Sequence, residues 1–294
     1  MLSAKDNLKS LVQGIYDLQK LRIQTGNRIV ANYKIKLGQD PSNKEDTIDK
    51  EAAQYLESVR QHFRLLTEGL LTIPTPSSFK PDGVIDNYTE MNLIAMYTRV
   101  YEDELLQFKR IKGTIKDFPI WTEFLIDIKG VGPMMAAVII SSLDPHKAKY
   151  PSSFHKYLGL DVVNGEGRSK KKRHLIDVDY IDAEGDPQTK KSITYNPWAK
   201  TKLVGVLGPC FVKQDAAVSK YRRIYNDYKH RISHHIDHKD KSKGHRNNMA
   251  IRYMVKQFLI DLHMKWRELE GLPVSLPYAE AKLGYTHGKD QNAA

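Results

Sequence analysis

The chain has 294 residues, 40% of them hydrophobic, enough for one large domain or two ordinary domains with their own cores. Its one cysteine, Cys210, excludes an intramolecular disulfide, and the first segment, MLSAKDNLKS, lacks the apolar run of a secretory signal. No run of about 18 apolar residues occurs. We therefore expect a soluble, cytoplasmic protein without a membrane span, nucleoid-associated if its source is bacterial.

The net charge of +11 is unevenly distributed along the chain. Residues 145–256 hold 24 Lys and Arg against 11 Asp and Glu, whereas the remainder holds 22 against 24. A basic field confined to one segment is typical of a surface that binds the phosphates of a nucleic acid. The alternative is a charged surface that serves solubility alone.

The first 112 residues predict a near-neutral, all-helical unit. Apolar residues recur at spacings of three and four over 8–35, 46–70 and 88–112, which places them on one stripe of each helix. Asn43 or Asp46 can cap the second helix. The stripes are wide enough for a bundle, and we expect residues 1–112 to be an oligomerisation module that makes the protein a homodimer.

Shorter elements follow Asp117. Apolar spacing predicts helices at 119–128, 133–143, 152–158, 197–209, 213–235 and 245–270. Alternation over 175–181, a turn at 183–187 and a second strand near 192–195 predict a β-hairpin. The expected fold is mainly α: a bundle of long helices over 1–112, a second domain over 113–270 with a small β-hairpin insertion, and a tail over 271–294.

A Gly-Val-Gly turn lies in the sequence FLIDIKGVGPMMAAVII, residues 124–140. One glycine permits a positive φ, the other allows a foreign backbone to approach, and Val131 points toward the core. The segment resembles the helix-hairpin-helix motif of proteins that hold a nucleic-acid backbone. The resemblance implies that the amides near Gly130, Gly132 and Met134 bind a phosphate, with Lys129 supplying charge. An ordinary glycine turn between packed helices is the alternative.

The order of the segments after this turn narrows the resemblance. The sequences SLD, YPSSFHKYLGL, a glycine-containing basic stretch, WAKTKL, YRRIYNDY and GHRNNMAIRYMVK follow one another between residues 142 and 256. This order is similar to the C-terminal domain of the insertion-sequence one-ten/one-sixteen transposases, the bridge-RNA-guided recombinases of mobile genetic elements. The similarity covers about residues 88–270 and implies DNA binding in recombination.

Two departures from that family bear on catalysis. The family's N-terminal RNase-H-like domain, with its acidic metal ligands, has no counterpart in the first 112 residues, so two-metal chemistry is not expected. The family's nucleophilic serine corresponds to Ser169 in GEGRSKKKR. Lys170 stands where a glycine normally follows, and the spacing from Leu160 is longer. A serine in a basic loop can instead contact a phosphate or only solvent.

Further nucleic-acid contacts are expected from three clusters of basic residues. They are the loop of Arg168, Lys170, Lys171, Lys172 and Arg173, the pair Arg222 and Arg223, and Lys243, His245 and Arg246 at the start of the last helix. Tyr221, Tyr225 and Tyr228 lie around the arginine pair. They suit stacking on bases and packing against a neighbouring helix equally well.

His230, His234 and His238 would align on one helical face and could hold zinc. Without a cysteine or an HExxH motif beside them, we expect no metal or other cofactor, and a basic helix face that lies along phosphates.

We expect the partner to be DNA, or structured RNA, held through its backbone. Two alternatives stay open: a serine-dependent transposase or recombinase that uses Ser169, and an assembly protein that packs nucleic acid. A base-excision glycosylase would need a catalytic Asp about twenty residues after the hairpin, where residues 150–153 read YPSS and Asp144 falls too early.

Overall fold

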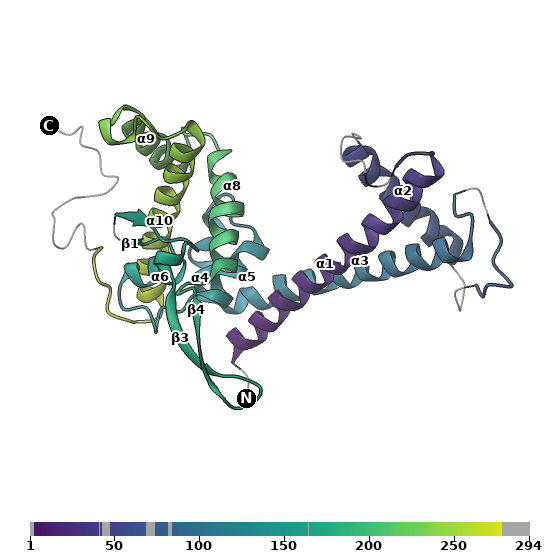
Figure 1. The fold of residues 1–294 in the computed structure, drawn as a ribbon, viewed down its shortest axis with the longest axis horizontal. Coiled ribbons are helices and arrows are strands. Elements are labelled where there is room, and N and C mark those ends of the chain that lie inside the picture. Colours follow the sequence, from purple (N-terminus) through teal and green to yellow (C-terminus); the bar gives the residue numbers. More distant parts are fainter. Residues whose placement is uncertain are drawn as a thin grey trace. The chain divides into compact units, whose positions relative to one another are not determined.

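The computed structural model describes residues 3–40, 42, 48–68, 74–81, 84–163 and 165–277. The chain divides into two compact units, Ser10–Lys112, which we call the helical unit, and Met1–Lys9 with Gly113–Ala294, which we call the hairpin unit. Helices predominate, with two small antiparallel sheets (Figure 1). The predicted mainly α fold with a β-hairpin insertion is therefore confirmed. Among the described residues, no helix has both the length and the apolar character needed to cross a membrane.

Three long helices form the helical unit: α1 (Ala4–Lys36), α2 (Ile48–Thr67) and α3 (Tyr88–Thr114). They match the three helices predicted from apolar spacing, and the candidate caps Asn43 and Asp46 lie outside the described residues. The core draws on all three helices and on the segment before α3. Its buried members are Ile29, Val59, Phe63, Ile85, Met91, Ile94 and Tyr97.

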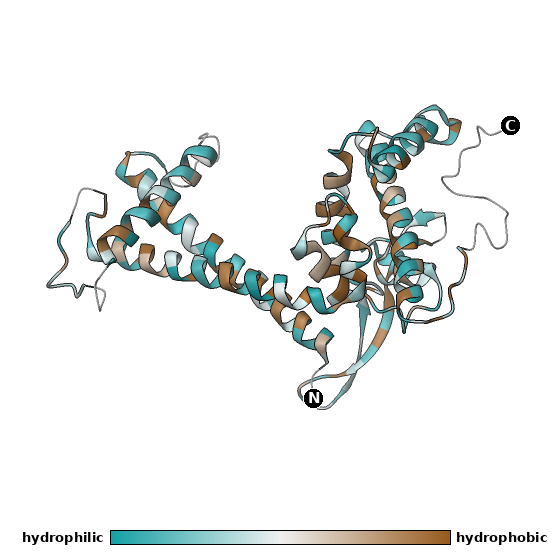
Figure 2. Ribbon diagram, turned by 180° about the vertical axis from the view of Figure 1, so that it is seen from behind, coloured by the Kyte–Doolittle hydropathy of each residue, from teal (hydrophilic) through white to brown (hydrophobic). Residues whose placement is uncertain are grey.

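The hairpin unit is built around one long helix. Its helices are α4 (Pro119–Thr122), α5 (Pro133–Ser142), α6 (Pro151–Tyr157), α7 (Pro197–Lys200), α8 (Gly208–Val212), α9 (Lys220–His234) and α10 (Lys243–Leu269). Helix α10 packs against α6, α8 and α9. Helix α5 is apolar along most of its length and buried from Ala136 to Ser141, as a core helix should be. Figure 2 shows hydrophobic residues gathered where these helices meet.

Three predicted helices differ in the structure. The helix expected over 197–209 consists of α7, a π-helix over Thr201–Leu207 and α8. The helix expected over 119–128 is broken into α4 and a 3₁₀ turn, Leu125–Asp127, because Phe124 has φ −150° and ψ −60°. The helix expected over 213–235 begins only at Lys220, where the Ser219 side chain accepts the N–H of Arg222 and caps α9. Local backbone geometry and capping therefore set these boundaries.

The β-hairpin pairs β3 (Ile176–Ile181) with β4 (Pro187–Ser192), and Ile176 lies opposite Ser192. The position predicted for the second strand, near 192–195, was wrong. The turn ends at Asp186, so the strand begins at once with Pro187. The Oδ1 of Asp182 accepts the N–H of Asp186 at 2.8 Å, and Gly185 has φ +92°. A second pairing, β1 (Val162–Val163) with β2 (Glu166–Gly167), was not predicted.

Candidate nucleic-acid interface

The Gly-Val-Gly turn joins the 3₁₀ turn to α5. Gly130 has φ +97°, in the left-handed region that favours glycine. Val131 is 5% exposed and anchors the turn in the core. Gly132 has an extended backbone, with φ −80° and ψ 172°, and a Cβ added there would meet no atom within 4 Å. The second glycine therefore faces open space.

Three backbone N–H groups at the turn have no acceptor among the described residues. The N–H groups of Val131 and Ala136 donate to Ile128 and Gly132. Over the described part of the chain, no acceptor is bonded to the amides of Gly132, Met134 and Met135. Unpaired amides at a helix start favour an anion.

Gln214 holds the turn in place through its side chain. Its Nε2 donates to the carbonyl of Lys129 at 2.6 Å. The same nitrogen is only 2.7 Å from the position that a Cβ on Gly130 would take. Gln214 could not be predicted from the sequence, because it lies 85 residues from Lys129 and belongs to no motif.

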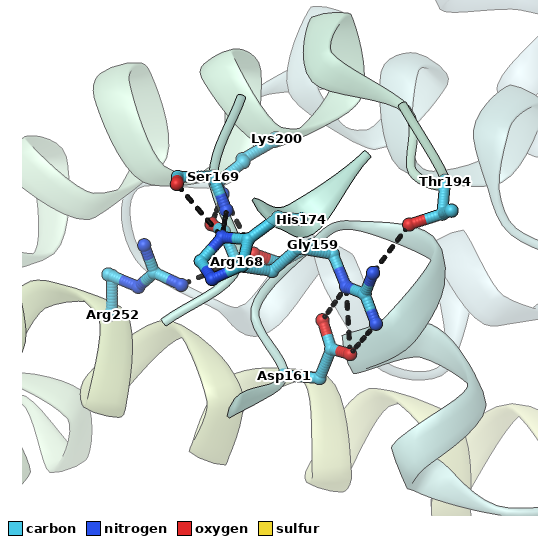
Figure 3. A network of polar contacts seen from close by, with 8 residues as sticks. All are labelled: Gly159, Asp161, Arg168, Ser169, His174, Thr194, Lys200 and Arg252. Carbon is cyan, nitrogen blue, oxygen red and sulfur yellow. Dashed lines mark hydrogen bonds and ion pairs between the residues drawn. The ribbon is translucent and has the colours of Figure 1, made fainter. Parts of the chain in front are cut away.

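Ser169 lies in a second polar site, shown in Figure 3. Its Oγ is 3.0 Å from the Nδ1 of His174, and its backbone N–H donates to the same nitrogen at 3.0 Å. Because a backbone N–H can only donate, Nδ1 is the acceptor and the ring proton lies on Nε2. His174 is 4% exposed, and its Nε2 has no hydrogen-bond partner among the described residues.

Three cationic side chains, Arg168, Lys200 and Arg252, also lie at the Ser169 site. Arg168 forms a bidentate pair with Asp161, at 2.9 Å and 2.7 Å, and donates to Thr194 at 2.6 Å. The Nζ of Lys200 donates to the carbonyls of Gly159 at 2.7 Å and Arg168 at 3.0 Å. The Arg252 guanidinium donates to the same Gly159 carbonyl at 3.2 Å.

The hydrogen bonds to Asp161 raise the pKa of Arg168, whereas burial dominates the electrostatics of Lys200 and Arg252. It lowers the pKa of Lys200 to about 8, and the positive charge of Arg252 acts in the same direction. Burial also lowers the pKa of Arg252 and of Lys256, and nearby Asp161 opposes this only in part. The site thus gathers positive charge in a place where water stabilises it poorly.

Residues 122–192 match the model of the Transposase IS116/IS110/IS902 family. We call them the transposase segment. The segment contains the Gly-Val-Gly turn, α5, α6, Ser169 and the β-hairpin, so the resemblance noted in the sequence is confirmed over these residues. No curated protein and no solved structure matches the chain. No RNase-H-like domain model matches it either.

The basic loop of the transposase segment is partly neutralised. Arg173 and Lys171 both pair with Glu166, the lysine at 3.5 Å, and Arg168 pairs with Asp161. Lys170 and Lys172 are exposed. Those two lysines are the residues of the loop best placed to reach an external phosphate.

The predicted contacts beyond the transposase segment divide into two groups. Arg222 donates to the carbonyl of Val212 and Arg223 to that of Ala217, so both help to hold the turn before α9. Lys243 and His245 are exposed at the start of α10, and Arg246 is half-buried.

Two of the three tyrosines around the arginine pair belong to the core. Tyr221 and Tyr225 are 5% and 3% exposed. Tyr228 stacks on Tyr253, with ring centroids 4.0 Å apart. Packing rather than base stacking therefore accounts for these side chains.

The predicted alignment of His230, His234 and His238 was wrong, because α9 ends at His234 and His235 is extended. His238 lies in a separate 3₁₀ turn, where its ring contacts Lys241. Within the described ranges, no three His, Cys, Asp or Glu side chains are grouped to hold a metal ion.

Proposed function

We propose that the hairpin unit binds DNA through its backbone phosphates. The observation that carries this proposal is the turn at Gly132, where the glycine faces open space and three amides at the start of α5 have no acceptor among the described residues. Such donors bind phosphate oxygens without reading bases. The match of residues 122–192 to a transposase family and the basic excess over 145–256 support the same conclusion.

Gly132→Thr tests this proposal. The backbone at Gly132 suits any residue and an added Cβ has room, and Thr caps helices about as well as Gly, so the fold should be kept. The branched side chain would occupy the approach to the amides. We expect affinity for a mixed-sequence duplex, measured by fluorescence anisotropy, to fall by on the order of tenfold, as for the loss of one charge-assisted phosphate contact.

The control is Gly113→Thr, because a Cβ at Gly113 also meets no neighbour and Gly113 belongs to α3 rather than to the turn. Circular dichroism and urea unfolding of both variants monitor the fold. Equal affinity of Gly132→Thr and the unchanged protein would contradict phosphate binding by the turn.

A second candidate function is strand cleavage with Ser169 as the nucleophile, supported by the contact between its Oγ and His174. The Oγ attacks phosphorus and its proton passes to Nδ1. A new P–O bond to serine forms, the P–O bond to one deoxyribose breaks, and the released oxygen takes up a proton. One phosphodiester replaces another, so the step consumes no co-reactant.

The test is a covalent adduct between the full chain and a labelled duplex, resolved under denaturing conditions. We expect Ser169→Ala to abolish the adduct and to keep duplex binding. His174→Gln should slow adduct formation by on the order of a hundredfold, the usual size of a general-base contribution. An adduct that persists in Ser169→Ala, or no adduct with the unchanged protein, would contradict this second function.

A further inference from the structure

Lys200 and Arg252 converge on one uncharged atom. Lys200 ends α7 and Arg252 lies on α10, yet both donate to the carbonyl oxygen of Gly159, at 2.7 Å and 3.2 Å. The nearby carboxylate, Asp161, is engaged by three contacts with Arg168. Two cations therefore share a neutral acceptor while the adjacent negative charge is already paired.

This arrangement is costly without a further anion. Burying a cation is unfavourable unless an opposite charge compensates it. Lys200 and Arg252 are both partly buried; burial lowers the pKa of each, and the positive charge of Arg252 lowers the pKa of Lys200 further. Lys256, one turn further along α10, adds positive charge close to Arg252. An anion bound between these side chains would remove the repulsion.

The pair lies directly beside Ser169. Lys200 also donates to the carbonyl of Arg168 at 3.0 Å, which belongs to the peptide bond that supplies the Ser169 N–H. The guanidinium of Arg252 lies against Gly167, where an added Cβ would be 2.9 Å from its Nη2. The two cations thus contact the backbone on the N-terminal side of Ser169, and Figure 3 shows them around it.

We propose that Lys200 and Arg252 together bind one phosphodiester group of the DNA backbone next to the Oγ of Ser169. The ammonium supplies a compact charge and the guanidinium a planar pair of donors, a combination suited to the oxygens of a phosphate. This inference rests on the proposed function, since it names the residues that receive the DNA at the Ser169 site.

Competitive acetylation of the unmodified full chain tests the inference. Trace acetic anhydride reacts only with uncharged amines, so the labelling of each lysine, followed by mass spectrometry from pH 7 to pH 10, reports its charge and access. The groups around the Lys200 amine are Arg252, Arg168, Asp161 and the ring of Tyr195 at 4.6 Å. We expect Lys200 to react early in this range, and a duplex to protect it on the order of tenfold.

Lys36 is the matched control. It is partly buried like Lys200, but its ammonium lies between Asp86 and Glu90, at 2.7 Å and 2.6 Å. A duplex should not change its labelling. A merely structural Lys200, tying two carbonyls together, would also be labelled equally with and without duplex, and that result would overturn the inference.

Variants separate this inference from the proposed function. Lys200→Met should reduce adduct formation and duplex affinity, and Lys200→Arg should restore much of the affinity because it keeps the charge. If the unchanged protein binds no duplex, the proposed function itself is wrong. If duplex binding is lost in Gly132→Thr but Lys200 is never protected, DNA binding stands and only the Lys200–Arg252 site is wrong.

Discussion

Lys36 of the helical unit and Lys200 of the hairpin unit are both partly buried but differ in how their charge is compensated. In the helical unit, burial alone would lower the pKa of Lys36, but the carboxylates of Asp86 and Glu90 raise it above its usual value. In the hairpin unit, burial lowers the pKa of Lys200 to about 8, and the neighbouring Arg252 adds to the effect. Lys36 is therefore paired with two carboxylates, whereas Lys200 forms no ion pair with a described residue and Asp161 offsets the effect of burial only in part.

The difference extends beyond one pair of lysines. Arg22 and Arg60 of the helical unit pair with Glu104 and Glu57, and the pKa of each arginine is raised. The pKa of Arg252 in the hairpin unit is lowered by burial. A folded chain keeps uncompensated buried charge mainly where function needs it. We therefore expect the paired cations of the helical unit to serve stability, and Lys200 and Arg252 of the hairpin unit to bind an external anion.

The largest expected loss of stability comes from removing a carboxylate that compensates a cation of the helical unit. Glu90 is 3% exposed and accepts hydrogen bonds from Asn32, Lys36 and the N–H of Asp86. Glu90→Leu removes the shared acceptor of these donors and leaves Lys36 with Asp86 alone, and we expect the free energy of unfolding to fall by about 3 kcal/mol or more. Urea unfolding followed by far-ultraviolet circular dichroism measures it.

Lys200→Met is the counterpart of that change in the hairpin unit. It removes a charge that forms no ion pair with a described residue, so we expect the free energy of unfolding to fall by less than about 1 kcal/mol. All three tryptophans, Trp121, Trp198 and Trp266, belong to the hairpin unit, so their fluorescence follows its unfolding. A larger destabilisation by Lys200→Met than by Glu90→Leu would break the comparison between the units.

A medium effect is expected from pH. Burial lowers the pKa of His155 to about 4, and the charge of Lys256 contributes. As pH falls, the unfolded chain therefore binds this proton at a higher pH than the folded protein does. The contribution of neutral His155 to stability is full above about pH 6.5 and is lost as pH falls toward 4. At about 1.4 kcal/mol per pKa unit, the loss is at most about 3 kcal/mol.

His155→Gln removes this titration and can keep the contact with the Lys256 carbonyl. Tryptophan fluorescence during urea unfolding at several pH values should then show a flatter pH dependence than in the unchanged protein. The exposed His245→Gln serves as control. If the free energy of unfolding of His155→Gln changes with pH as steeply as that of His245→Gln, His155 is not the group responsible for the pH dependence.

The smallest effect is expected at the surface of the β-hairpin. Lys191 and Asp177 pair at 2.7 Å with both side chains 58% exposed. Such a pair contributes less than about 0.5 kcal/mol, so Lys191→Ala should leave the urea midpoint nearly unchanged. A loss well above about 1 kcal/mol would show that charge pairing matters for stability in the hairpin unit as well, which would weaken the contrast.

The sequence predicted the helices well wherever apolar spacing was long and regular, as in α1, α2 and α3. It failed where one residue decides the backbone: Phe124 interrupts a helix, and Asp182 closes the β-turn early. Periodicity carries no information on either event, because both depend on local dihedral angles and side-chain to backbone bonds.

The candidate site could be predicted only in its motif residues. The Gly-Val-Gly turn and Ser169 were found from their neighbours in sequence. Lys200 and Arg252 were missed because they reach Gly159 from 41 and 93 residues away. His174, five residues after Ser169, could have been noticed as a candidate base. The zinc hypothesis failed because helical spacing was assumed beyond His234, where α9 ends.

The salt dependence of duplex binding tests the central claim most directly, namely that the hairpin unit holds DNA by cations, Lys200 and Arg252 among them, that nearby carboxylates compensate only in part. We expect the affinity of the full chain to fall about a hundredfold or more between roughly 50 and 200 mM salt. The double variant of Lys200→Met and Arg252→Gln should lower the slope of log affinity against log salt by about 1 to 2. An affinity that does not change over this range, or an unaltered slope in the double variant, would contradict the account.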